Sequence, residues 1–250
     1  MRIILVTGTG TEIGKTVVTA AVAALALAEG SQVAVLKPAQ TGVAEGEPGD
    51  AEEVRRLVGA DLAAGLTLSE LARYPEPLAP ATAAARSGLP PVSPERIAEE
   101  AARLAADHDL VLVEGAGGLL VRYDEQESTL AELPAALRAL GLESSVLLVV
   151  TAGLGTLNTT ALTAEALRAR GVPLLGLVIG AWPAEPDLAA RCNLADLPLV
   201  ADAPLLGALP AGVAQHGADR VSLQITARSS LAPALGGVWV SPSMAPSVNR

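Results

Sequence analysis

The residues best suited to chemistry lie near the amino terminus, where Gly-Thr-Gly-Thr-Glu-Ile-Gly-Lys-Thr at residues 8–16 follows an apolar run. A β-branched strand, a glycine-rich turn and Gly-Lys-Thr at the start of a helix form the layout of a phosphate-binding P-loop. Backbone N–H groups and the helix dipole face a polyphosphate, Lys15 adds a positive charge, and the Thr16 hydroxyl can hold Mg²⁺. The common spacing places the first glycine at Thr9, so the loop is either one residue longer or begins at Gly10 in another conformation.

A second positive charge is expected beside this loop. Lys37 ends another apolar run and is followed by Pro-Ala-Gln-Thr-Gly at residues 38–42. Because parallel strands end at the same edge of a sheet, two ammonium groups there suit a ligand with two anionic centres or a reaction that develops negative charge. The alternative is a strand-end lysine that extends to solvent. Asp50 starts a predicted helix and either caps it or supplies a carboxylate for Mg²⁺.

Two further glycine-rich loops follow predicted strands. Glu114 ends an apolar run and precedes Gly-Ala-Gly-Gly at residues 115–118. Such a carboxylate occupies the place of the acidic residue that holds Mg²⁺ in P-loop NTPases, and the glycines let backbone amides approach a ligand. Residues 151–158, Thr-Ala-Gly-Leu-Gly-Thr-Leu-Asn, precede another predicted helix. The start of that helix either binds a carboxylate or phosphate or is simply capped by Thr156 or Asn158.

The elements that position these groups follow from hydrophobic periodicity. Strand-like apolar runs occur at residues 3–7, 32–36, 109–114, 145–151, 174–180 and 198–200. Helical patterns occur at residues 15–29, 50–58, 94–106, 129–140, 158–170 and 187–195. Most of the runs are continuously apolar, as in parallel strands covered on both faces. The sequence therefore predicts an α/β fold with a doubly wound, mainly parallel sheet flanked by helices, in one domain over residues 1–240 with a flexible tail at 241–250.

Composition narrows the function classes. The net charge of −10 argues against nucleic acid as the main partner, although a nucleotide needs only one local positive pocket. Cys192 is the only cysteine, which excludes an intramolecular disulfide and favours a cytoplasmic protein. No apolar run approaches the length of about 20 residues that a membrane span needs. No cysteine and histidine cluster has the spacing of a zinc site.

Taken together, the segments at residues 7–16, 37–42, 114–118 and 153–158 resemble dethiobiotin synthetase in order and spacing. The resemblance extends from residue 1 to about residue 215. It implies a P-loop fold and a ligase of biotin biosynthesis that forms C–N bonds. Such an enzyme uses Mg²⁺ and a nucleoside triphosphate to carboxylate 7,8-diaminononanoate with CO₂ and close the ring of dethiobiotin, through a carbamate and a carbamic–phosphoric anhydride. It also implies a homodimer, with the substrate carboxylate bound near residues 155–158 of the partner subunit.

The resemblance assigns a role to each matching position. The residues implied in catalysis are Lys37, Lys15 and Thr11. Those implied in nucleotide binding are Gly10, Thr11, Glu12, Ile13, Gly14, Lys15, Thr16, Val17, Gly180, Leu209 and Pro210. Those implied in substrate binding are Thr11, Lys37, Thr41, Gly117, Gly118, Gly155, Thr156, Leu157 and Asn158. The implied metal ligands are Thr16, Asp50 and Glu114.

Some questions stay open at the level of sequence. Where many members of this family read adenine with an asparagine, the chain has Gly-Ala-Trp-Pro at residues 180–183, so ATP, CTP and GTP are all considered. Two other functions fit a P-loop. A partitioning or regulatory ATPase usually carries an additional lysine early in the loop, where this chain has Gly10. An amide synthetase of the cobyrinic acid type usually needs a glutaminase domain, for which 250 residues and one cysteine leave no room.

Overall fold

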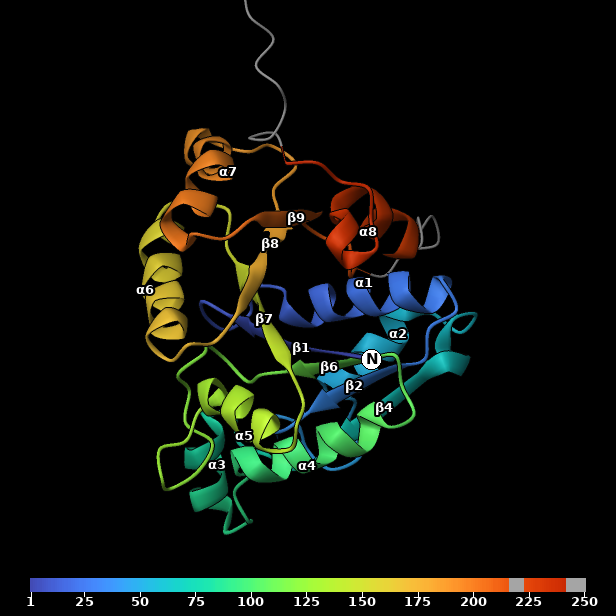
Figure 1. The fold of residues 1–250 in the computed structure, drawn as a ribbon, viewed down its shortest axis with the longest axis vertical. Helices are drawn as coiled ribbons and strands as arrows, with labels where there is room; N and C mark the ends of the chain where they lie inside the picture. Colours follow the sequence, from blue (N-terminus) through green and yellow to red (C-terminus); the bar gives the residue numbers. More distant parts are fainter. Residues whose placement is uncertain (216–222, 242–250) are drawn as a thin grey trace, which may run out of the picture.

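Strand β1 lies at the centre of a parallel sheet within residues 1–215 and 223–241, which the structure, a computed structural model, describes (Figure 1). Seven strands of this part of the chain are ordered β4-β2-β6-β1-β7-β8-β9, and neighbouring strands run parallel. Their bounds are β1 Arg2–Gly8, β2 Val33–Lys37, β4 Leu66–Glu70, β6 Leu110–Glu114, β7 Ser144–Val150, β8 Leu174–Trp182 and β9 Leu205–Pro210. The strand order reverses beside β1, where sheets of this kind bind ligands.

The central strands are apolar along their whole length because both faces of the sheet are covered. In β1, Ile4 and Val6 belong to the core on one face, whereas Ile3 and Leu5 belong to the core on the other. All four side chains are buried. The predicted doubly wound, mainly parallel sheet is therefore confirmed.

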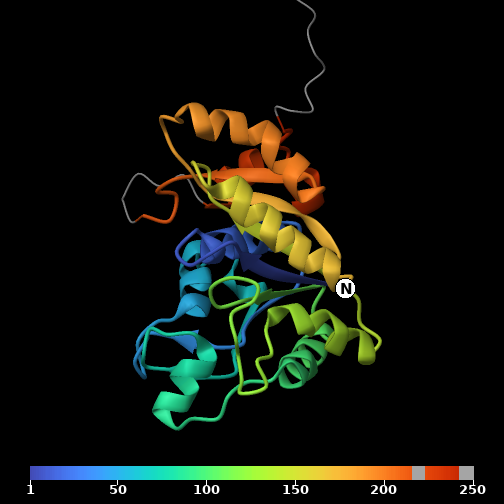
Figure 2. The ribbon, with the colours of Figure 1, turned by 90° about the vertical axis from the view of Figure 1, so that its left-hand side faces the viewer.

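Helices form a layer on each face (Figures 1 and 2). One layer contains α1 Lys15–Ala28, α2 Asp50–Val58 and α8 Leu223–Ser230. The other contains α4 Pro94–Ala105, α5 Leu133–Ala139, α6 Thr156–Ala169 and α7 Leu188–Ala201. Alanine is common where α1 meets the sheet, and its small side chain lets helix and strand backbones approach closely. The loop before α1 is thereby held against the end of β1.

Shorter elements surround these layers. The strands β3 Gln40–Thr41 and β5 Arg73–Tyr74 pair in a small parallel sheet, and α3 Pro80–Ser87 follows them. The described residues also contain the 3₁₀ segments η1 Ala63–Gly65, η2 Leu130–Glu132 and η3 Pro233–Leu235. The small sheet places Gln40 and Thr41 beside the carboxyl end of β2, next to Lys37.

The structure corrects one predicted strand. Residues 198–200 lie in the last turns of α7, and the strand that follows is β9. A short apolar run is equally compatible with a buried strand and with the apolar face of a helix. In this chain the run belongs to α7, which continues through Pro198. β4 and β9 are strands of the main sheet that the sequence patterns did not predict. The other five strands and the six helices are confirmed with small shifts at their ends.

The single domain over residues 1–240 stays a prediction. Of the predicted tail, 241–250, only Ser241 lies within the described residues. Among those residues, no helix has both the length and the apolar character needed to span a membrane.

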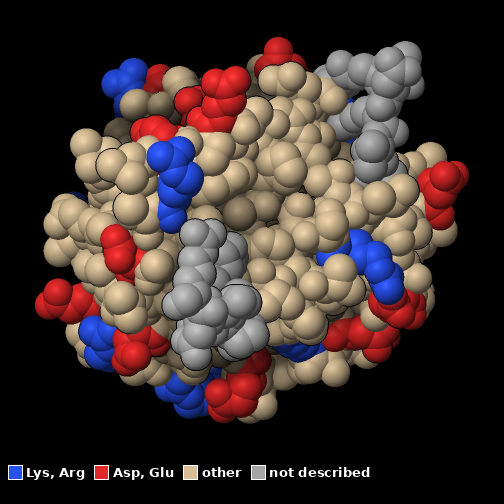
Figure 3. Space-filling view, turned by 90° about the horizontal axis from the view of Figure 1, so that it is seen from above, with Lys and Arg blue, Asp and Glu red and all other residues tan. Residues whose placement is uncertain are grey.

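Charged side chains are scattered over the face of the molecule that lies at the top of Figure 1 and is seen directly in Figure 3. Among the described residues of this face, Lys and Arg side chains lie apart from one another and form no continuous patch. The expectation that nucleic acid is not the main partner stays a prediction.

Candidate active site

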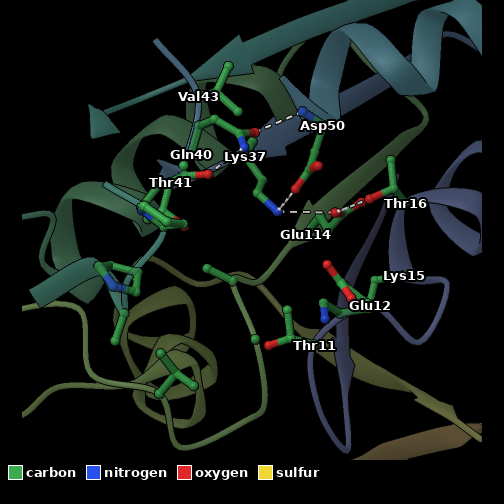
Figure 4. A pocket seen from close by; sticks show the side chains of 18 of the residues that line it. Thr11, Glu12, Lys15, Thr16, Lys37, Gln40, Thr41, Val43, Asp50 and Glu114 are labelled. Carbon is green, nitrogen blue, oxygen red and sulfur yellow. Dashed lines mark hydrogen bonds and ion pairs between the residues drawn. The ribbon is translucent and has the colours of Figure 1, made fainter. Parts of the chain in front are cut away.

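The carboxyl ends of β1, β2 and β6 open onto one cavity of about 840 Å³ (Figure 4). Both Lys15 and Lys37 line it, so the structure brings the two predicted ammonium groups together. Of the residues implied by the family resemblance, the cavity is lined by Thr11, Glu12, Gly14, Lys15, Thr16, Val17, Lys37, Thr41, Asp50, Glu114 and Gly117. Three segments far apart in the sequence therefore supply one polar site.

The P-loop lies between β1 and α1. Gly8 is still part of β1, and the turn residues are 9–14. Glu12 and Gly14 have positive φ angles of 58° and 94°, which bend the backbone so that α1 begins at Lys15. The Lys15 ammonium donates a hydrogen bond of 2.8 Å to the carbonyl oxygen of Gly10. Burial lowers the pKa of Lys15, and the nearby charge of Lys37 lowers it further.

Glu114 is the acidic centre of the site. Its side chain is almost fully buried at the end of β6. One carboxylate oxygen, Oε1, accepts hydrogen bonds from the Thr16 hydroxyl at 2.8 Å and from the Lys37 ammonium at 3.1 Å. The other, Oε2, accepts a hydrogen bond of 2.7 Å from the Thr19 hydroxyl. Sequence reasoning missed Thr19, although its i,i+3 spacing from Thr16 places both hydroxyls on one face of α1.

Lys37 joins the two acidic residues of the site. Its Nζ atom lies 2.5 Å from Asp50 Oδ2 and 3.1 Å from Glu114 Oε1, and the side chain is only 4% exposed. Burial opposes the charge of this ammonium, but Glu114 and Asp50 outweigh burial and raise the pKa of Lys37 above its ordinary value. The alternative of a lysine that extends to solvent is therefore wrong, and Lys37 is a charged, buried group.

Asp50 does not cap its helix. The N-cap position of α2 is Gly49, whose N–H donates to Glu52 Oε2 at 2.9 Å. The Asp50 carboxylate instead faces Lys37, while its backbone N–H donates to Gln40 Oε1 at 2.8 Å. The side-chain amide of Gln40 also donates to the carbonyl oxygen of Thr41 at 3.2 Å. Gln40, a buried polar side chain, was missed as a positioning residue, although it lies only three residues after Lys37 at the end of β2.

The oxygen atoms around Lys37 fit a magnesium ion. Within the described part of the chain, no group of three or more His, Cys, Asp or Glu side chains is placed to hold a metal unaided. Thr16, Asp50 and Glu114 nonetheless supply a hydroxyl and two carboxylates, and the two carboxylates converge on the Lys37 ammonium (Figure 4). Mg²⁺ prefers such oxygen ligands and completes its octahedron with phosphate oxygens and water. The donor set therefore fits Mg²⁺ bound together with a nucleotide.

Several implied residues do not line the cavity. They are Gly10, Ile13, Gly118, Gly155, Thr156, Leu157, Asn158, Gly180, Leu209 and Pro210. Gly155 is the N-cap of α6, and no side chain caps that helix, so capping by Thr156 or Asn158 is not observed. The adjoining Leu154 is 93% exposed. Leu209 is buried in the core. The nucleotide-binding role implied for Leu209 and Pro210 stays a prediction.

Gly180 supports the P-loop from β8. A Cβ atom at Gly180 would lie 2.0 Å from the carbonyl oxygen of Ile13, so only glycine fits at this position. We expect Gly180→Ala to displace the loop, to lower the free energy of unfolding by about 1–3 kcal/mol and to weaken nucleotide binding. Denaturant unfolding and nucleotide titration measure the two effects. Gly153→Ala is the matched control, because a Cβ there meets no atom within 4 Å. Equal stability of both variants would contradict this packing role.

Tyr123 holds the glycine-rich loop that follows β6. Its buried hydroxyl accepts a hydrogen bond of 2.8 Å from the backbone N–H of Ala116. Burial raises the pKa of Tyr123, so the phenol stays protonated. Because Tyr123→Phe leaves that N–H unpaired in the interior, we expect a loss of about 1–3 kcal/mol in the free energy of unfolding. Urea denaturation checks this. Tyr74 provides the control for turnover. Its hydroxyl donates a hydrogen bond of 2.7 Å to the carbonyl oxygen of Pro90, and Tyr74 does not line the cavity, so Tyr74→Phe should leave turnover unchanged.

Comparison with known proteins places this geometry in a family. A family model described as "AAA domain" matches residues 2–213. An ATP-dependent dethiobiotin synthetase from Streptomyces avermitilis is 60% identical over 245 residues, which cover 98% of each chain. One from Saccharopolyspora erythraea is 62% identical over 239 residues, which cover 96% of this chain and 99% of the relative.

Solved structures agree on the fold. A ParA family ATPase from Chlorobium tepidum has a TM-score of 0.55 at 13% identity, covering 90% of this chain and 96% of its own. The MinD cell division protein of Aquifex aeolicus has a TM-score of 0.54 at 14% identity, covering 91% of this chain and 96% of its own. At such low identity these two likenesses show the P-loop fold and nothing more. The sequence relatives decide the family: the chain belongs to the ATP-dependent dethiobiotin synthetases, ligases that form C–N bonds.

Proposed function

We propose that this protein converts 7,8-diaminononanoate and CO₂ into dethiobiotin in biotin biosynthesis, driven by ATP and Mg²⁺. The observation that carries this proposal is the single cavity in which a P-loop, two lysines and two carboxylates meet. High identity to named synthetases over nearly the whole chain supports the same activity. The similarity to partitioning ATPases concerns the fold alone.

The proposed reaction proceeds in three balanced steps. One amine adds to CO₂ and loses a proton, which gives a carbamate. A carbamate oxygen then attacks the γ-phosphorus, and the bond between the γ-phosphorus and the bridging β-phosphate oxygen breaks. ADP is the leaving group, and the product is a carbamic–phosphoric anhydride. The second amine attacks the carbamoyl carbon, phosphate departs, and a proton is released as the cyclic urea closes.

The second step explains why the site is cationic. A carbamate and a triphosphate are both anions, so bringing their oxygen and phosphorus atoms together is opposed by charge repulsion. Positioning and electrostatic stabilisation therefore matter more than a general base. We assign Lys15 to the phosphates and Lys37 to the charge shared between carbamate and γ-phosphate. Thr11, Thr41 and Gly117, which line the same cavity, would position the diamine and the carbamate.

The metal ligands in this proposal are Thr16, Asp50 and Glu114. These residues would hold Mg²⁺, which would supply positive charge to the phosphate oxygens. Thr19 would fix the orientation of the Glu114 carboxylate through its hydrogen bond to Oε2, and Gln40 would hold the start of α2 that carries Asp50. Both are positioning residues.

We also propose that the enzyme acts as a homodimer. Residues 155–158 do not line the cavity of their own chain, and the neighbouring Leu154 is almost fully exposed. The same segment of a second copy would bind the carboxylate of the diamine at the N-terminus of α6, where unpaired N–H groups and the helix dipole favour an anion. Sedimentation or light scattering tests the dimer directly.

The decisive experiment supplies the purified protein with Mg²⁺, ATP, bicarbonate and the diamine, and detects the cyclic urea by mass spectrometry. We expect phosphate release and urea formation in equal amounts, and phosphate release that depends on the diamine. Nucleotide hydrolysis that is indifferent to the diamine, without a urea product, would refute the proposal. A thermal-shift panel of ATP, CTP and GTP with Mg²⁺ tests the nucleotide preference, because this chain has Ala181 and Trp182 where the family resemblance implies an adenine-reading asparagine.

A further inference from the structure

The proposed metal site already contains a positive charge that belongs to the protein. Lys37 Nζ lies 2.5 Å from Asp50 Oδ2, 3.1 Å from Glu114 Oε1 and 3.5 Å from the carbonyl oxygen of Gly115. The Thr16 hydroxyl donates to the same Glu114 oxygen. Figure 4 shows the ammonium between the two carboxylates, with Thr16 on the far side of Glu114. One ammonium thus contacts both of the carboxylates assigned to Mg²⁺.

We propose that Lys37 is the resident counter-ion of the metal site: it pairs with Asp50 and Glu114 while the site holds no divalent ion, and it gives up those carboxylates when one binds. This inference rests on the proposed function, because it takes Asp50 and Glu114 as the metal ligands. It adds a second role to Lys37. The side chain first keeps the ligands in place and is then released toward the reacting oxyanions.

Electrostatics requires such an exchange. The Glu114 side chain is 2% exposed, and an unpaired charge at that depth costs several kcal/mol. A cation must therefore accompany it before nucleotide binds. A divalent ion that takes the same carboxylate oxygens would lie within a few ångströms of the ammonium, and the two positive charges repel each other strongly in a poorly solvated site. Both cations cannot keep these contacts.

The lysine side chain suits this movement. Its ammonium is a compact charge on a flexible stem of four carbons, so it can leave the carboxylates without moving the backbone of β2. Once a divalent ion neutralises the two carboxylates, the charge of Lys37 is available to anions in the same cavity. Binding of metal and activation of the lysine would then be one event.

Lys15 provides a matched comparison. It lines the same cavity and carries the same charge, but its ammonium bonds to the Gly10 carbonyl oxygen and to neither carboxylate. Removing Lys15 therefore changes the charge of the cavity without vacating the contacts made by Lys37. The chain also has no other lysine, so labelling with ¹⁵N-lysine yields side-chain signals from Lys15 and Lys37 alone.

The first test measures Mn²⁺ binding to nucleotide-free protein by calorimetry or electron paramagnetic resonance. We expect Lys37→Met to bind one Mn²⁺ about tenfold or more tightly than the wild type, because the competing charge is gone. Lys15→Met should change the affinity by less than about threefold, since it vacates no ligand. Adding Asp50→Asn to Lys37→Met should abolish the gain. Unchanged affinity in Lys37→Met, or an equal gain in Lys15→Met, would overturn the proposal.

A second measurement uses the wild-type chain and does not depend on the folding of a variant. In ¹⁵N-lysine-labelled protein, Mg²⁺ with a non-hydrolysable triphosphate should shift the Lys37 Nζ signal well beyond the shift caused by the triphosphate without metal. A Lys37 signal that is insensitive to the metal would contradict the exchange. Neither experiment includes the diamine or bicarbonate, so a synthetase that makes dethiobiotin normally could still fail both tests. Conversely, an inactive protein could pass them.

Discussion

In the Lys37→Ala variant, kcat for dethiobiotin formation falls by about 10³-fold, while the affinity for the nucleoside triphosphate changes by less than about tenfold. The reason is that the ammonium acts mainly on charge that develops as carbamate and γ-phosphate react, and much less on the bound triphosphate. Lys37 pairs with Asp50 and Glu114 in the nucleotide-free protein, so it is not committed to phosphate in the ground state. Single-turnover kinetics and nucleotide titration separate the two effects.

Lys15→Ala is the informative comparison for this experiment. Lys15 begins α1 and bonds to the P-loop carbonyl of Gly10, so its loss should weaken triphosphate binding and turnover together. Far-UV circular dichroism establishes that both variants are folded. If Lys37→Ala reduced binding and turnover by equal factors, Lys37 would be a ground-state ligand and its assignment to the transition state would be wrong.

The main sheet could be predicted because burial on both faces leaves a direct trace in the sequence. A strand such as β1 must be apolar at successive positions, and a continuous run of Ile, Leu and Val is what that environment requires. The helix that follows is marked just as clearly by Gly-Lys-Thr at its start. These two local signals sufficed to place the P-loop at the correct end of the correct strand.

The edges of the sheet are where the patterns failed. β4 and β9 are outer strands with fewer buried positions, and β9 contains Gly207 in its middle. Residues 198–200 form an apolar run, yet they continue α7 because Leu197 and Ala201 pack into the core beneath that helix. Tertiary packing, which no local pattern encodes, decided between helix and strand.

The site was predictable to the extent that it is built from strand ends. Lys37 and Glu114 are charged residues directly after apolar runs, and the parallel sheet brings them to one edge. Thr19, Gln40 and Tyr123 escaped notice because each acts through another residue: their polar atoms serve Glu114, Asp50 and Ala116. Such supporting bonds depend on how elements approach in space, and the sequence alone does not specify that approach.

Glu114→Gln tests the proposed metal ligand with the least exposed side chain. We expect the Mg²⁺ concentration for half-maximal activity to rise by about 10²-fold, because a neutral amide replaces a carboxylate at the metal. The amide oxygen can still accept a hydrogen bond from Thr16 or Thr19, so the substitution removes charge while keeping the shape of the site. Activity measured across a Mg²⁺ titration at saturating nucleotide gives the result.

Two further variants decide whether the loss is specific to the metal site. Asp50→Asn should shift the Mg²⁺ dependence in the same direction but less, because the Asp50 side chain is 39% exposed and water can replace it as a ligand. Glu99→Gln, on an exposed position of α4, removes one negative charge far from the cavity and should leave the titration unchanged. If Glu114→Gln responded to Mg²⁺ like the wild type, Glu114 would be only the partner of Lys37, and the metal would have to be held by Thr16, Asp50 and the nucleotide.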